Sequence, residues 1–219
     1  LLYECPYGNR TVLAYPVFTS SYSGTSIDLK NGAFRNGEFT GQPIKFINFS
    51  ALNNHSRYAV VPASIKNYMG VVDMSCGYPA PFPNGTYNTH HVGASQMFQF
   101  LARKQEWLKD VPYYWDVCLD SSVFRFCYTG GVLGKFMKTI RSADVNIITA
   151  IRVGWGSRTD ETMASQTNTL VASTDPVALD YWASTNILGP ATKAAGAPEY
   201  FIKLNDPSLE TNPFRAFLE

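Results

Sequence analysis

Two carboxylates stand at a predicted strand-to-helix junction, in the run Ser-Thr-Asp-Pro-Val-Ala-Leu-Asp at residues 173–180. Residues 169–172 have the pattern of a strand that leads directly into this run. Asp175 is a strong N-cap candidate, because its carboxylate can accept the free N–H groups of a first helical turn, and Pro176 suits the first helical position. Ligands of open α/β sheets gather at such junctions. The junction is therefore a candidate binding site, while the alternative, that Asp175 only caps the helix, stays open.

Asp180 is the second carboxylate of the run. It lies in Val-Ala-Leu-Asp-Tyr-Trp-Ala, a predicted helix that is apolar on nearly every side. An unpaired carboxylate among such neighbours would cost several kcal/mol, so Asp180 needs a cation, a metal ion or hydrogen-bond donors. A buried lysine such as Lys66, or an arginine, would satisfy it without any ligand. In a functional site, Asp175 and Asp180 would together order a cation or that lysine.

The run Ile-Lys-Asn-Tyr-Met-Gly at residues 65–70 is a second cluster. Lys66 and Asn67, followed by a glycine, predict a turn that offers one cation and one amide to a phosphate or a carboxylate. The alternative is that Lys66 is simply exposed to solvent, because lysines at strand ends usually are. The hypothesis that unites both clusters is a small anionic ligand, with Lys66 neutralising its charge, at a site of four residues: Lys66, Asn67, Asp175 and Asp180.

Three histidines and an aspartate are candidates for a metal site: His55, His90, His91 and Asp73. Adjacent histidines point to opposite sides of an extended segment, so His90 and His91 cannot easily bind one ion together. One of that pair, with His55 and either Asp73 or Asp175, is a chemically sensible set for a divalent metal. The alternative is that the histidines are surface or hydrogen-bonded structural residues. The cofactor is therefore unknown, with a divalent metal as one candidate and a histidine as its ligand or as a general base.

Periodicity predicts an α/β domain that positions these residues. The clearest strand covers residues 145–155. Its face of Val145, Ile147, Thr149, Ile151, Val153 and Trp155 is almost wholly apolar or β-branched, and we expect this face to meet the core. The Gly-Trp-Gly-Ser run that begins at Gly154 is either a ligand loop lined by backbone or a plain turn. Strands and helices alternate along the chain, which favours a mixed or mostly parallel sheet flanked by helices. The other predicted elements are strands over 44–49 and 169–172 and helices over 93–110 and 132–141.

Residues 1–43 differ from the rest of the chain. They are rich in Gly, Ser, Thr, Asn and Tyr, and the turn dipeptides Asn31-Gly32 and Asn36-Gly37 predict β-hairpins. We therefore expect a hairpin-rich segment over 1–43 and an α/β domain over 44–219. The chain opens without Met, so we also expect it to begin inside a longer precursor.

The composition argues against nucleic-acid binding and a membrane span, and it suggests an alternative function as an assembly subunit. The formal net charge of +1 offers no basic field for nucleic acid, and no apolar run reaches the roughly 18 residues of a membrane span. Catalytic and nucleotide-binding motifs such as Gly-x-Ser-x-Gly, His-Glu-x-x-His, Walker A and Gly-x-Gly-x-x-Gly are absent. The aromatic fraction of 14% would serve an assembly interface, so a non-catalytic structural or assembly subunit, in a homo- or hetero-oligomer, is the alternative function.

The cysteines and the glycosylation sequons favour an extracytoplasmic protein, periplasmic or secreted. No Cys-x-x-Cys pair occurs, which argues against a zinc ribbon, a thioredoxin-like site and a ferredoxin cluster, so we expect no iron–sulfur cluster. Two disulfides are one alternative and four buried thiols the other, with thiol redox chemistry least favoured. The cysteines are Cys5, Cys76, Cys118 and Cys127, and the sequons begin at Asn9, Asn48, Asn54 and Asn84.

The two clusters together resemble one family. Residues 65–70 resemble its Lys-Asn-x-x-Gly signature, and residues 173–180 resemble its Ser-Thr-Asp-Pro-x-Ala-x-Asp signature. Over roughly residues 44–190 the chain is similar to the family catalogued as domain of unknown function 362. The resemblance implies a fold and candidate positions, but no assigned reaction. His55 and the pair at 90 and 91 fall where family members often carry histidine.

The chain also departs from this family's pattern. Residues 1–43 do not resemble its usual opening, so the resemblance implies that an N-terminal part is replaced or missing. Ala63-Ser64 stands where Thr-Gly is more usual, and Gly154-Trp155-Gly156 replaces a Gly-Pro loop. Members are bacterial and archaeal, some exported and some fused to ferredoxin-like modules. The lack of a ferredoxin-type cysteine pattern puts electron transfer through a cluster in doubt for this chain.

Overall fold

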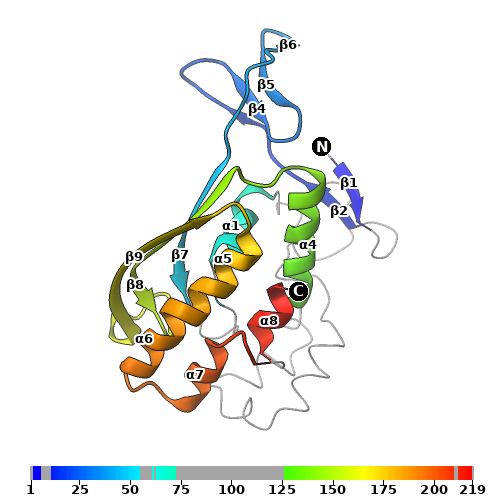
Figure 1. Ribbon diagram of the computed structural model, residues 1–219. Coiled ribbons are helices and arrows are strands. Elements are labelled where there is room, and N and C mark those ends of the chain that lie inside the picture. Colours follow the sequence, from blue (N-terminus) through cyan, green and yellow to red (C-terminus); the bar gives the residue numbers. More distant parts are fainter. Residues whose placement is uncertain are drawn as a thin grey trace.

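The structure, a computed structural model, describes residues 2–5, 11–54, 61, 63–72, 126–209 and 212–218 (Figure 1). Its strands are β1 (Leu2–Cys5), β2 (Thr11–Ala14), β3 (Phe18–Thr19), β4 (Ser26–Asp28), β5 (Gly32–Arg35), β6 (Glu38–Phe39), β7 (Ile47–Asn53), β8 (Val145–Gly154) and β9 (Ala164–Ser173). Its helices are α1 (Ser64–Asn67), α4 (Phe126–Thr139), α5 (Pro176–Ala183), α6 (Gly189–Ala194), α7 (Glu199–Leu204) and α8 (Pro213–Leu218). Short 3-10 turns cover Tyr68–Val71 and Glu161–Met163, and a π-helical turn, Ser184–Leu188, joins α5 to α6.

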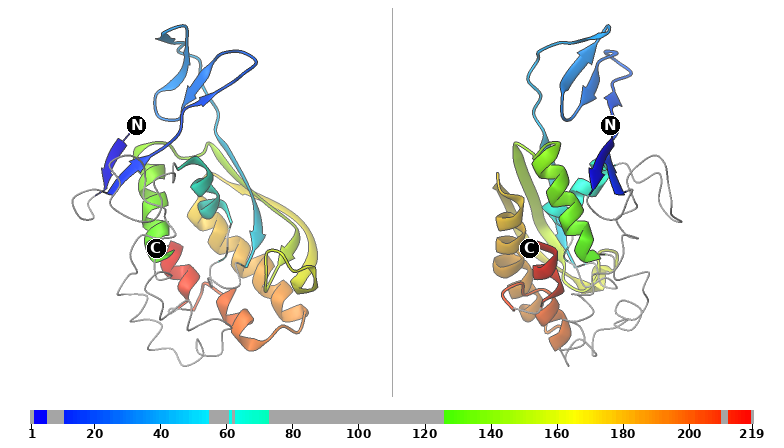
Figure 2. Two further views of the ribbon diagram at one scale, coloured as in Figure 1. Left: turned by 180° about the vertical axis from the view of Figure 1, so that it is seen from behind. Right: turned by 90° about the vertical axis from the view of Figure 1, so that its right-hand side faces the viewer.

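The central sheet has the strand order β7-β8-β9, with β7 parallel and β9 antiparallel to β8. The predicted α/β class with a mixed sheet is confirmed. Side chains of β7 alternate strictly between buried and exposed, because one face of the sheet packs on the helices and the other does not. The helices α1, α5 and α6 contact the strands on the covered face (Figures 1 and 2).

The predicted elements differ from the observed ones mainly at their ends. The strand predicted over 145–155 is β8, and the helix predicted over 132–141 is α4, which begins earlier and runs through Gly130 and Gly131. The strand predicted over 44–49 begins at Ile47 instead. The prediction over 169–172 was too short, because β9 begins at Ala164 and residues 164–166 also pair with β8 although they lack an apolar alternation. The helix predicted over 93–110 lies outside the described residues.

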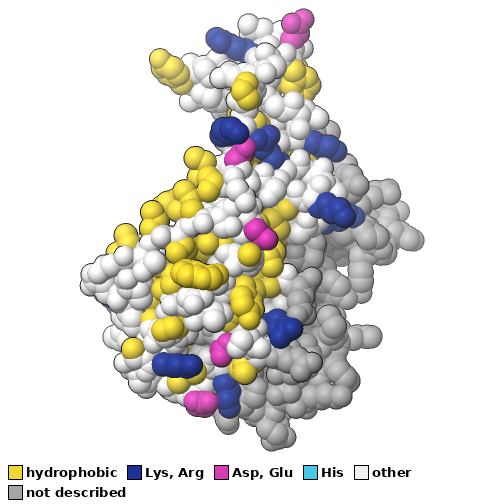
Figure 3. All heavy atoms as spheres, in the orientation of Figure 1, with side chains coloured by type: hydrophobic (Ala, Val, Ile, Leu, Met, Phe, Trp, Pro, Cys, Tyr) yellow, Lys and Arg dark blue, Asp and Glu magenta, His cyan; other side chains and the backbone are white. Residues whose placement is uncertain are grey.

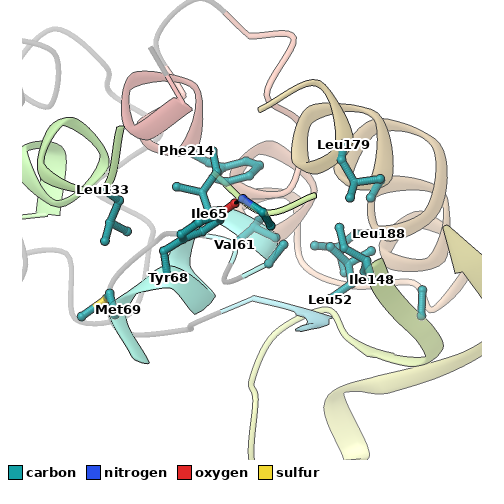
Figure 4. Packing of buried hydrophobic residues seen from close by; sticks show 14 of the residues in the cluster. Leu52, Val61, Ile65, Tyr68, Met69, Leu133, Ile148, Leu179, Leu188 and Phe214 are labelled. Atoms are coloured by element: carbon teal, nitrogen blue, oxygen red, sulfur yellow. Dashed lines mark hydrogen bonds between the residues drawn. The ribbon is translucent and has the colours of Figure 1, made fainter. Parts of the chain in front are cut away.

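The core lies between the covered face and the helices. Buried side chains of β7 and β8, such as Leu52 and Ile148, meet Leu179 and Leu188 from the α5–α6 region, while Tyr68 packs edge-on against Phe136 of α4. Figure 4 shows Leu52, Ile148, Leu179 and Leu188 close to one another, with Phe214 of α8 beside Ile65 of α1. The first two residues of α1, Ser64 and Ile65, are thus buried in the core, which fixes the position of this short helix.

The hairpin-rich segment predicted near the N-terminus is confirmed. Strands β3 to β6 form an antiparallel meander that stands away from the rest of the chain (Figures 1 and 2). Asn36 and Gly37 take positive φ angles of 53° and 90°, as a tight turn between β5 and β6 requires. At the base, the Tyr15 hydroxyl donates to Asp28 over 3.1 Å and the Tyr15 ring packs against Phe136. The meander is therefore anchored to the core through Tyr15, which lies in the segment between β2 and β3.

Among the residues that the structure describes, the helices are too short or too polar for any of them to cross a membrane.

Candidate functional site

Asp180 is fully buried and binds the first turn of α1. Its Oδ1 accepts hydrogen bonds from the Ser64 backbone N–H (2.8 Å) and the Ser64 hydroxyl (2.5 Å), and its Oδ2 accepts one from the Ile65 N–H (2.9 Å). No ion pair joins Asp180 to a lysine or arginine of the described residues. Of the partners that the sequence allowed, the protein supplies hydrogen-bond donors, because the start of a helix leaves its N–H groups without internal acceptors.

The environment of Asp180 changes its acidity. Burial raises the pKa of the Asp180 carboxyl from its ordinary 3.8 to about 7, against the lowering effect of the hydrogen bonds from Ser64 and Ile65. The Ser64 hydroxyl also lies 3.2 Å from the Pro176 carbonyl oxygen. When Asp180 is ionised, this hydroxyl can donate to it. When Asp180 is protonated, the carboxyl can donate to Ser64, which then donates to Pro176, so both forms have hydrogen-bond partners.

We expect the free energy of unfolding to fall as the pH rises from about 4 to about 7. The folded pKa lies above the unfolded one, so the stabilising contribution of Asp180 is complete below the unfolded pKa and is lost as the pH passes the folded pKa. A shift of about three pKa units corresponds to a change on the order of 4 kcal/mol. Urea unfolding of the wild type and of Asp180→Asn, across this range, isolates the effect because all other carboxylates are shared. A difference between the two proteins that stays constant with pH would contradict it.

A buried network of amides fixes the junction to the sheet. Asn146 of β8 accepts hydrogen bonds at Oδ1 from Asn48 of β7 (2.9 Å) and from the Tyr68 hydroxyl (3.1 Å). Its own amide lies 3.3 Å from the carbonyl oxygen of Ser173, at the end of β9. Asn48 also donates to the Ser64 carbonyl oxygen over 2.7 Å. The network therefore connects the segments around Tyr68 and Ser173 to the first residues of β7 and β8, at one end of these strands.

Asn67 belongs to this network through its amide nitrogen. Its Nδ2 donates to the Asn48 side chain (2.6 Å) and to the Phe49 carbonyl oxygen (3.1 Å), which uses both amide hydrogens. The sequence predicted that the Asn67 amide would be offered to a ligand. Because both N–H groups are used within the protein, only the Oδ1 atom of Asn67 could bind a ligand, as an acceptor.

Asp175 caps α5 as predicted. Its Oδ1 accepts hydrogen bonds from the backbone N–H groups of Val177 (2.9 Å) and Ala178 (3.0 Å), and Pro176 occupies the first helical turn. The Asp175 side chain is exposed, and within the described residues its Oδ2 has no hydrogen-bond partner. The capping prediction is confirmed, and whether Asp175 also binds a ligand stays a prediction.

Lys66 is the half-buried cation of the site. Within the described parts of the chain, its amine makes neither an ion pair nor a hydrogen bond. Burial, together with the positive charge of Arg158, lowers the pKa of Lys66 from 10.5 to about 8. Arg158 is exposed and its side chain likewise has no partner among the described residues. The two positive charges are thus close enough to repel each other, and among the described residues neither forms an ion pair with a carboxylate.

Sequence reasoning missed two residues of this site, Ser64 and Arg158. The signal for Arg158 was its place directly after the Gly-Trp-Gly-Ser run. That run is a packed turn: the Gly154 N–H donates to the Asn53 side chain (3.0 Å), and the Trp155 N–H donates to the Met163 carbonyl oxygen (2.9 Å). The backbone groups of this turn therefore stabilise the fold. Arg158, which follows the turn, is the residue whose positive charge lowers the pKa of Lys66.

Several predictions fall on residues outside the described ranges. These are the metal candidates His55, His90, His91 and Asp73, and also Cys76 and Cys118. In the ranges that are described, no group of three or more His, Cys, Asp or Glu side chains could hold a metal. The disulfides and the extracytoplasmic location stay predictions.

Two of the predicted glycosylation sites are wrong. Asn48 and Asn54 are both buried, and their amide nitrogens, the atoms that would carry a glycan, donate internal hydrogen bonds. The partner of Asn54 is the Asn205 side chain, at 2.6 Å. A folded chain has no room for a sugar at either position.

Comparisons with known proteins give one match. Neither a curated protein nor a solved structure matches the chain. A family model described as "Domain of unknown function (DUF362)" matches residues 43–185. This range covers more than half of the chain, from just before β7 to just beyond α5, and includes Lys66, Asp175 and Asp180. The chain therefore belongs to the DUF362 family of domains of unknown function.

Proposed function

We propose that this protein binds a small anion, a carboxylate or phosphate group, at Lys66. One observation carries the proposal: Lys66 is a half-buried cation with no anionic partner among the described residues, and the positive charge of Arg158 repels it. Holding such a charge away from water is costly unless an opposite charge compensates it. A bound anion would compensate both cations at once.

The residues around Lys66 act as positioning residues in this proposal. Asp180 holds the first turn of α1, and the Asn67 amide holds its last residue against β7. The backbone on both sides of Lys66 is therefore fixed to the core, which limits the entropy that an anion would have to overcome on binding. Asp175 adds an exposed acceptor at the same junction, suited to a donor group or a cation on the ligand.

The test uses sulfate, whose charge is constant between pH 7 and 9, and inorganic phosphate as a second probe. We expect both anions to raise the melting temperature of the wild type, and calorimetry to show sulfate affinity falling as the pH rises through about 8, where Lys66 loses its proton. Lys66→Met keeps the apolar stem and removes the charge. A charge-assisted contact of about 1.5–3 kcal/mol makes the expected loss of affinity about 10- to 100-fold.

Lys193→Met is the matched control, because Lys193 is an exposed lysine on α6, outside the signature segments. It should bind sulfate as the wild type does. Arg158→Gln should weaken binding less than Lys66→Met, since Arg158 is the more exposed cation. Equal sulfate affinity for the wild type and Lys66→Met would refute the proposal.

A further inference from the structure

The central sheet leaves one face uncovered and apolar. Four large side chains on that side are more than half exposed: Ile47 (57%), Phe49 (58%), Ile151 (56%) and Leu170 (63%). We call this surface the open face; it comprises Ile47, Phe49 and Ala51 of β7, Val145, Ile147, Thr149 and Ile151 of β8, and Leu170 and Ala172 of β9. In Figure 3 hydrophobic side chains line the edge of the molecule where Figure 1 places β8 and β9.

Strand register makes the open face continuous. Phe49, Ile147 and Ala172 stand in one row across the three strands, and Ala51, Thr149 and Leu170 stand in the next. Ile151 sits at a β-bulge of β8, where the register shifts, and extends the apolar surface along that strand. A sheet face that water covers is normally polar, and all-parallel sheets are covered on both faces, so a bare apolar face of this kind calls for a covering partner.

We propose that the open face is the interface at which a second copy of this chain docks. Its apolar side chains expose on the order of 600 Å², the upper end of what a single chain usually leaves uncovered. Two such faces together would bury about 1,200 Å², which is the lower limit for a specific and stable interface. A surface much smaller than this would not hold a dimer, and this one reaches the required size.

The charges of this surface also favour a copy of itself. No described residue on the open face is acidic; Arg152 follows the bulge at one end of it, and the ion pair of Lys45 with Asp144 lies just before β7 and β8 at the other. A twofold axis through the row of Phe49 would set the two copies of Arg152 at opposite ends of the interface. The centre then pairs apolar side chains with identical ones, as stacked sheets do when they pack face to face.

The experiment is sedimentation equilibrium of the full chain between about 1 and 500 μM, a range that detects micromolar dissociation constants. We expect a mass that approaches twice the 24.3 kDa of one chain as concentration rises. Leu170→Glu places a carboxylate on the open face of both copies and should raise the dissociation constant about 30-fold or more. Tyr22→Glu is the control, since Tyr22 is fully exposed on the meander, and should dimerise as the wild type does.

Two further variants separate loss of the interface from loss of the fold. Leu170→Thr keeps a strand-forming residue and should weaken the dimer while its circular dichroism matches the wild type. Mixing Phe49→Glu with Phe49→Lys should restore a dimer, because the axis through the row of Phe49 brings these two side chains together across the interface. A wild type that stays monomeric at the highest concentration, or a dimer that Leu170→Glu leaves intact, overturns the proposal.

Discussion

Replacing Asp180 by alanine is expected to lower the free energy of unfolding by about 3–5 kcal/mol at pH 5.5. The substitution leaves the backbone N–H groups of Ser64 and Ile65 buried without acceptors, and each such group costs about 1–3 kcal/mol. The lost carboxyl also leaves a cavity in a fully buried site. Urea unfolding followed by circular dichroism measures the change.

Asp175→Ala is the matched control for Asp180→Ala. Asp175 stands at the start of α5 and Asp180 lies within it, and each carboxylate accepts hydrogen bonds from two backbone N–H groups. Asp175 is exposed, however, so in Asp175→Ala water can accept the hydrogen bonds that the carboxylate loses. Losing an exposed N-cap costs about 1 kcal/mol. If the two variants lost the same stability, the burial of Asp180 would have no energetic consequence and its role in holding α1 would be wrong.

The second large effect is expected at Gly154, the last residue of β8. A Cβ atom there would lie 2.0 Å from the Ser157 carbonyl oxygen and 3.0 Å from Asn53 Oδ1. The first contact is with backbone, which cannot rotate away as a flexible side chain would. Gly154→Ala therefore has to displace the turn that leads to Arg158, at a cost of about 3 kcal/mol, the upper range for overpacking. Thermal and urea unfolding of the soluble variant give the value.

Gly134→Ala tests whether this loss comes from the contact rather than from glycine replacement in general. Gly134 lies in α4, and a Cβ atom there would have nothing within 4 Å. Alanine in a helix interior is favoured over glycine by about 0.8–1 kcal/mol, so this variant should be slightly more stable than the wild type. Similar destabilisation by both substitutions would show that the contact at Ser157 is not the cause.

Local features of the fold were predictable because they depend on neighbours in the sequence. The cap at Asp175, the proline after it and the Asn36-Gly37 turn each rest on backbone groups within a few residues, and all three are confirmed. The alternation of β8 was equally clear, but the face expected to meet the core was wrong: Asn146, Ile148 and Ala150 are buried, and the face of Ile147 and Ile151 is the more exposed one, because the helices pack on the other side of the sheet.

The partners of Asp180 were not predictable, because they lie more than a hundred residues away in the sequence. The pattern showed that a carboxylate among apolar neighbours needs compensation, but not whether a cation or backbone donors would supply it. The proximity of Arg158 to Lys66 also depends on the path of β8 across the sheet. Asn48 and Asn146 carried an unused signal: a polar residue on the buried side of an apolar strand needs a partner.

The acidity of the Lys66 amine, measured by NMR with Lys66→Met to assign its signal, tests the anion site most directly. In the free protein the pKa of Lys66 should lie near 8, because burial and Arg158 both disfavour its charge. Saturating sulfate should raise that pKa, since a bound anion stabilises the protonated amine. A pKa near the ordinary 10.5 without sulfate, or one that sulfate leaves unchanged, would mean that Lys66 is solvated and binds no anion.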